Sequence, residues 1–122
     1  FGHTFGHAFE ASLGFSKKLN HGEAVLLGMN VALEFSKEKN ILSFKDFSKI
    51  KNHMINSKLP SDIKKYFSSK NINQILTFMI KDKKNISNRI NLILLKKIGS
   101  PIIDLNFTKK YLKNFFQKSL RN

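Results

Sequence analysis

Apolar residues recur at intervals of three and four along most of the chain, which is the spacing of one helix face. In the first half, this pattern predicts helices over residues 4–13, over residues 21–39 and from residue 43 or 44 onward. Gly14 is expected to cap the first helix, because glycine readily adopts the left-handed conformation that ends many helices. The expected buried residues are Val25, Leu26, Met29, Ala32 and Leu33 in the second helix, and Phe47, Ile50, Met54 and Ile55 in the third.

The second half is divided into shorter elements. The third helix must end before Pro60, because the residue preceding a proline disfavours the α region. Ser61 and Asn73 are candidate N-caps of two short helices, and Thr108 is a candidate N-cap of a last one. Residues 90–95 form an apolar run that fits either a strand or a buried helical turn. The expected loops are 81–88 and 99–101, and the inward-facing residues are Ile75, Leu76, Met79 and Ile80, then Leu112, Phe115, Phe116 and Leu120.

These elements describe a mainly α fold with room for one short strand pair. A chain of 122 residues suffices for one domain with one modest core, so residues 1–122 are taken as a single domain. A hydrophobic content of 41% excludes a disordered tail. The absence of cysteine excludes a disulfide scaffold and a cysteine-based zinc finger. No apolar run approaches the roughly 20 residues of a membrane span, so no membrane partner is expected.

The charge is strongly positive. There are 22 Lys and Arg against 8 Asp and Glu, a formal net charge of +14. Such an excess raises the possibility of a nucleic-acid partner, but only Arg89 and Arg121 are arginines, and base and phosphate recognition favours arginine. Lys, Asn, Ile and Phe share A/T-rich codons, so a biased base composition explains their joint excess. We therefore expect no nucleic-acid partner, although the positive field would attract anionic ligands.

Three of the four histidines lie in the first 21 residues. His3 and His7 are four positions apart, so they share one face of a helix, and Glu10 joins that face. Two imidazoles and a carboxylate suit a divalent metal, and they suit acid–base chemistry or phosphate contacts equally well. The spacing alone is also compatible with two partly buried helix histidines. The fourth, His53, is interpreted as a surface or packing residue.

His21 stands at the start of the second predicted helix and is followed by Gly22 and Glu23. The unpaired amides of a helix N-terminus favour anions. A glutamate in the first turn also suits the helix dipole. On spacing alone, Glu23 is therefore interpreted as an ordinary helix-start carboxylate.

Taken together, these motifs resemble the C-terminal domain of the 3-dehydroquinate synthase family, within the sugar-phosphate cyclases. The segments that carry the resemblance are GHTFGHAFE at 2–10, HGEAVLLGM at 21–29, DKKN at 82–85 and NLILLKKIG at 91–99. The resemblance implies a mainly helical domain beside an N-terminal α/β domain that binds NAD, with the active site between them. That domain would lie upstream of Phe1, so the chain is expected to be a fragment of a two-domain enzyme, commonly a homodimer in the cytoplasm.

The resemblance also implies a divalent metal, zinc or alternatively cobalt. His3 and His21 fall on two of the family's metal ligands, and the third ligand is a glutamate upstream of Phe1. Glu10 and Glu23 are expected to support the site by orienting those ligands. With two ligands of its own, the chain is expected to bind metal weakly and to be inactive alone.

The implied substrate is a small phosphorylated sugar acid. His7 falls on a residue that contacts the substrate near its phosphate, and either Lys83 or Lys84 falls on a lysine that contacts the phosphate end. The implied reaction converts 3-deoxy-D-arabino-heptulosonate 7-phosphate to 3-dehydroquinate and phosphate in the shikimate pathway, by transient hydride transfer to NAD, loss of phosphate, ring opening and aldol closure.

Three alternatives stay open on sequence. Another sugar-phosphate cyclase, such as 2-deoxy-scyllo-inosose synthase or a valiolone synthase, would share the histidine motifs. A non-catalytic basic binding module would require the lysines to cluster on one face. A decayed remnant would have been expected to lose His3, His7 and His21, which are all present.

Overall fold

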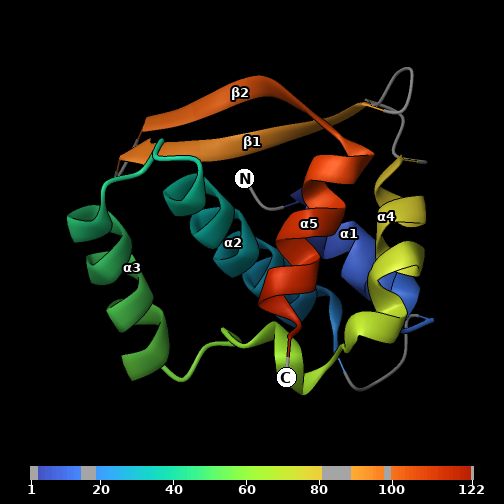
Figure 1. Ribbon diagram of the computed structural model, residues 1–122. Helices are drawn as coiled ribbons and strands as arrows, with labels where there is room; N and C mark the ends of the chain where they lie inside the picture. The colour runs from blue at the N-terminus through green and yellow to red at the C-terminus, as the bar shows by residue number, and fades with distance from the viewer. Residues whose placement is uncertain (1–2, 15–18, 81–88, 98–99, 122) are drawn as a thin grey trace.

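The computed structural model describes residues 3–14, 19–80, 89–97 and 100–121 (Figure 1). Over these residues the chain forms five α-helices, two short 3-10 turns and one antiparallel strand pair. The mainly α fold class with one strand pair is confirmed. The elements are α1 (His3–Ser12), α2 (His21–Glu38), α3 (Phe44–Asn56), η1 (Ile63–Lys65), η2 (Ser69–Asn71), α4 (Ile72–Ile80), β1 (Arg89–Lys97), β2 (Ser100–Thr108) and α5 (Lys109–Ser119).

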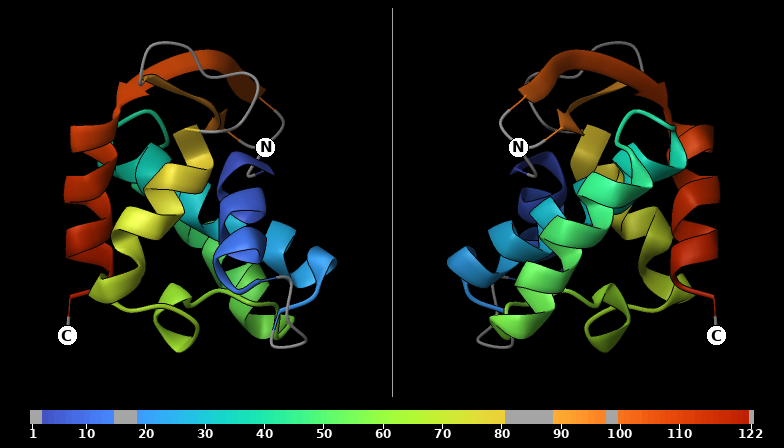
Figure 2. Two further views of the ribbon diagram at one scale, coloured as in Figure 1. Left: turned by 90° about the vertical axis from the view of Figure 1, so that its right-hand side faces the viewer. Right: turned by 90° about the vertical axis from the view of Figure 1, so that its left-hand side faces the viewer.

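Helix α2 is the centre of the arrangement. It contacts α1, α3 and strand β1, while α4 contacts both α1 and α5. The hairpin of β1 and β2 lies across one end of the helices, as both views of Figure 2 show. Its register pairs Ile90 with Phe107 and Leu92 with Leu105, and the register shifts after Leu92. In the described residues, no helix has the length and apolar character that a membrane span needs.

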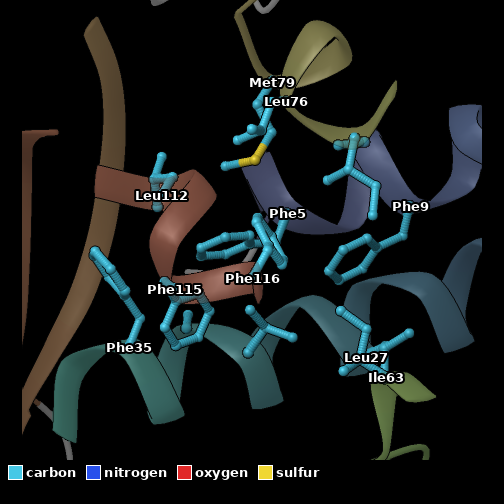
Figure 3. Packing of buried hydrophobic residues seen from close by; sticks show 14 of the residues in the cluster. Phe5, Phe9, Leu27, Phe35, Ile63, Leu76, Met79, Leu112, Phe115 and Phe116 are labelled. Carbon is cyan, nitrogen blue, oxygen red and sulfur yellow. The ribbon is translucent and has the colours of Figure 1, made fainter. Parts of the chain in front are cut away.

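Aromatic side chains fill the main core, between α1, α2, α4 and α5 (Figure 3). The rings of Phe5, Phe9 and Phe116 are fully buried, and the Phe116 ring lies edge-on to the other two across α1 and α5. Phe35 of α2 joins them through its contact with Phe5. A second, smaller cluster joins α2, α3 and β1, and its buried members are Leu33, Leu42, Phe47, Met54 and Leu95. The helix that carries His3 and His7 is thus anchored on its inner face by phenylalanines.

The helix ends follow local signals that were readable in the sequence. Gly14 has a φ of 65° and ends α1 as predicted. The side chains of Ser43 and Thr108 accept hydrogen bonds from backbone amides in the first turns of α3 and α5. Residues 90–95 lie in a strand, which decides between the two interpretations of that run. The predicted loop 81–88 lies outside the described residues.

Two predicted caps are wrong. The carbonyl of Ser61 accepts from the side chains of Asn30 and Lys51, and Ser61 precedes the cap of the next turn. Asp62 caps the next turn instead, and that turn is 3-10 rather than α. Asn73 lies inside α4, exposed, because the preceding turn η2 runs directly into the helix at Ile72.

The buried faces of α2 and α3 also differ in part from the prediction. Ala32 and Leu33 are buried, but the other three predicted residues of α2 are only half-buried. Because α2 is covered on several sides, its buried residues do not form one narrow stripe, and they include Leu27 and Phe35. Ile55 is 52% exposed, because α3 packs on α2 through its other side. Ser100 and Pro101 belong to β2 rather than to a loop.

Ser36 links α2 to the hairpin, which gives a stability prediction. Its buried hydroxyl donates to the carbonyl of Ala32 and accepts from the backbone amide of Leu95 at 3.1 Å. Ser36→Ala would leave that amide without its partner, so we expect a loss of about 1–3 kcal/mol in the free energy of unfolding. Urea unfolding measures this, with Ser48→Ala as the control, since Ser48 is a half-buried serine on α3. Equal midpoints for the two variants would contradict the link.

Candidate functional site

Helix α1 carries core residues on one face and the candidate functional residues on another. Phe5 and Phe9 are buried, whereas His3 and His7 are exposed and Glu10 is half-buried. The spacing of three and four places the two histidines and the glutamate on the opposite side of the helix from the phenylalanines. The helix therefore presents two imidazoles away from the core.

A capping box fixes where α2 begins. The side chain of Asn20 accepts from the backbone amide of Glu23 at 2.8 Å, and the Glu23 carboxylate accepts from the backbone amide of Asn20 at 3.1 Å. These two bonds satisfy donors that a helix end leaves unpaired. His21 is consequently the first residue of α2. Glu23 is thus a helix-start carboxylate, as its spacing predicted. Its bond to the Asn20 amide fixes the backbone next to His21.

The capping box predicts unequal effects for two asparagines. Asn20→Ala removes the cap, so we expect the free energy of unfolding to fall by about 1 kcal/mol. Asn73→Ala is the matched control, because Asn73 is exposed inside α4, where alanine is the better helix former. Urea denaturation of both variants makes the comparison. A larger loss for Asn73→Ala would contradict the assignment of the caps.

The two histidine-bearing segments meet in space. The ring of His7 lies 5.7 Å from that of His3 and 6.4 Å from that of His21, measured between centroids. Glu10 Oε1 lies 3.0 Å from His21 Nδ1, so one hydrogen bond joins α1 to the start of α2. Four of the site residues expected from the sequence therefore form one cluster on the surface.

The cluster supplies only part of a metal site. Imidazole nitrogen is a donor that zinc and cobalt accept. Among the described residues, however, no group of three or more His, Asp or Glu side chains converges to hold an ion. Any metal site at this cluster would therefore require a donor from beyond the described residues. A hydrogen bond from an imidazole to a carboxylate, as between His21 and Glu10, is the kind of contact that fixes the orientation of a ligating histidine.

The remaining candidates from the sequence are two lysines and one histidine. Lys83 and Lys84 lie outside the described residues, so the structure does not place them relative to the histidines. His53 is exposed on α3, in agreement with the surface interpretation. It therefore offers a control histidine for experiments on the cluster.

Gly6 is a site-related residue that the sequence pattern alone did not single out. A Cβ atom at this position would lie 3.0 Å from the carbonyl oxygen of Ala24 and 3.2 Å from the Cα of Val25. Glycine lets α1 approach the backbone of α2 this closely. A glycine inside a helix lowers the stability of the helix by about 1 kcal/mol relative to alanine. A glycine within a predicted helix was therefore the one sequence signal that pointed to a special role for this position.

Comparison with known proteins places both histidine segments within a family match. The family described as "3-dehydroquinate synthase C-terminal" matches residues 1–85, which include both histidine segments. The chain belongs to the 3-dehydroquinate synthase family. A 3-dehydroquinate synthase of Pelagibacter ubique is 53% identical over 120 residues, and one of Rhodopseudomonas palustris is 33% identical over 124. Each match covers 98% of this chain.

The chain spans about a third of the length of these relatives, 33% and 32% respectively. A solved structure of similar fold is that of 2-deoxy-scyllo-inosose synthase complexed with carbaglucose-6-phosphate, NAD+ and Co2+. The TM-score is 0.70 at 24% identity, over 97% of this chain and 32% of that one. This likeness concerns the fold, which the two proteins share over nearly the whole chain.

Proposed function

We propose that this chain is the metal- and substrate-binding C-terminal part of a 3-dehydroquinate synthase. The observation that carries the proposal is the convergence of His3, His7 and His21 from two helices onto one exposed cluster. The reaction would convert 3-deoxy-D-arabino-heptulosonate 7-phosphate to 3-dehydroquinate and phosphate, in the shikimate pathway of the cytoplasm. The 53% identity to a relative of that name favours this reaction over that of another sugar-phosphate cyclase.

His3 and His21 would be the two ligands that this chain gives to a divalent metal, zinc or cobalt. Glu10 supports this role for His21, because a carboxylate at Nδ1 holds the ring in the tautomer whose Nε2 is free to ligate. Glu23 supports it indirectly, because its capping bond fixes the first turn of α2. A glutamate from the rest of the enzyme would complete the site.

His7 would act on the substrate rather than on the metal. Its exposed ring lies beside both proposed ligands, so a bound sugar phosphate could reach all three histidines. There it would donate a hydrogen bond to the phosphate and stabilise the departing anion. Lys83 or Lys84 would add a positive charge at the same end of the substrate. When bound, NAD would supply the transient oxidation and the metal would supply Lewis acidity.

The rest of the enzyme would bring the missing groups. An N-terminal α/β domain would hold NAD and the third metal ligand, and the complete enzyme would be a homodimer. By itself this chain is expected to bind metal weakly and to show no turnover. The net charge of +14 would attract the anionic substrate, with no nucleic-acid partner required.

A chimeric enzyme tests the proposal. In it, this chain replaces the matching 120 residues of the Pelagibacter ubique relative. We expect the chimera to release phosphate from 3-deoxy-D-arabino-heptulosonate 7-phosphate and to form 3-dehydroquinate, at a rate comparable with the unaltered relative. A folded chimera that retains metal and NAD yet shows no turnover would contradict the proposed function.

A further inference from the structure

The crossing of α1 and α2 has almost no room between the two backbones at Gly6. A Cβ there would lie 3.0 Å from the Ala24 carbonyl oxygen and 3.2 Å from the Val25 Cα. Both contacts are with backbone, which cannot rotate away as the end of a side chain can. Any larger residue must therefore move one helix relative to the other by a few tenths of an ångström.

The same crossing carries the contact between the two histidine segments. Gly6 meets α2 at Ala24, and one turn later Glu10 meets it at His21. Four residues forward on α1 thus correspond to three residues backward on α2, so the helices run antiparallel along one interface. At a rise of about 1.5 Å per residue, the lengths of the two steps differ by only about 1.5 Å. A shift of the helices at Gly6 would accordingly change the distance between Glu10 and His21.

We propose that Gly6 is a positioning residue, whose lack of a side chain sets His3 and His7 at the correct distance from His21. The metal part of this inference rests on the proposed function. Metal ligands on two helices must be held within about half an ångström of a productive geometry. A displacement of the helices that is too small to unfold the chain can therefore still misplace the ligands. Alanine is also the better helix former, so the gain in helix propensity offsets part of the crowding.

Gly6→Ala tests the proposal, and Gly22→Ala is the matched control. The control adds the same methyl group within the first turn of α2, where its Cβ would make an ordinary contact of 3.6 Å with the Asn20 side chain. Thermal unfolding by circular dichroism reports stability. The NMR cross-relaxation between the His7 and His21 rings, with the tautomer of His21, reports alignment without metal. Titration of the metal-free chimeric enzyme with Co2+ reports the metal site to which both helices would contribute.

We expect Gly6→Ala to stay folded, to show weaker cross-relaxation between the two rings and to bind Co2+ about tenfold more weakly than the parent. Gly22→Ala should match the parent in all three measurements. An unchanged ring contact in Gly6→Ala would overturn the proposal, and so would an unfolded Gly6→Ala chain, because Gly6 would then hold the fold rather than the alignment. If the parent chimeric enzyme itself binds no Co2+, the metal ligands proposed for this chain fail, and the ring contact alone decides the role of Gly6.

Discussion

His7→Ala is expected to lower the kcat of the chimeric enzyme by about 100-fold or more. The His7 ring is exposed and lies beside the rings of both proposed metal ligands, His3 and His21. Its removal would take away a hydrogen-bond donor where charge develops on the departing phosphate. Because His7 is not one of the two proposed ligands, the metal content should be unchanged. Steady-state phosphate release and metal analysis on the same sample measure both quantities.

His53→Ala is the control for this variant, since His53 is exposed on α3 and lies outside the cluster. It should keep the turnover of the parent chimera. A His7→Ala chimera with normal kcat would exclude the substrate role of this histidine. Loss of metal together with activity would instead make His7 a metal ligand, contrary to its proposed role on the substrate.

Phe116→Ala is expected to lower the free energy of unfolding by about 3–5 kcal/mol. The Phe116 ring is fully buried, and its centroid lies 5.9 Å from that of Phe5 and 6.4 Å from that of Phe9. Truncation would leave a cavity between α5 and α1. This loss is a large fraction of the stability of a small domain. Because α1 carries His3 and His7, the variant should also disorder the cluster.

Phe44→Ala is the matched control, because Phe44 is 72% exposed at the start of α3. It makes the same chemical change and should cost well under about 1 kcal/mol. Urea unfolding followed by circular dichroism compares the two variants. Similar midpoints for both would mean that α5 does not pack against α1.

Local signals in the sequence were enough for most of the fold. Gly14 and Thr108 act within one turn of themselves, so their capping roles could be predicted without knowing what surrounds them. The stripe of the last helix was also predictable, because α5 buries one face only. Asn73 shows the limit of local reasoning. The turn η2 leads directly into α4 at Ile72, so Asn73 lies inside the helix and not at its N-cap.

Burial in the central helix could not be predicted from periodicity. The sequence pattern selected one stripe of α2, but α1, α3 and β1 cover it on several sides. Buried Ser36 bonds to Leu95, a partner 59 residues away in the sequence. Such contacts depend on tertiary packing, which no spacing rule within one helix contains.

The residues of the histidine cluster could be selected from the sequence, but the geometry of the cluster could not. Helical spacing placed His3, His7 and Glu10 on one face, and the resemblance added His21. The contact between Glu10 and His21 spans 11 residues and depends on how α1 crosses α2. The role of Gly6 depends on the same crossing. Both became visible only with the two helices in place.

The central claim is that His3 and His21, from two helices, hold one metal ion. The metal content of the purified chimeric enzyme tests it most directly, with His3→Ala, His21→Ala and His53→Ala measured in parallel. We predict one equivalent of divalent metal in the parent and in His53→Ala, and its loss in the other two variants. One full equivalent retained in both His3→Ala and His21→Ala would contradict the claim.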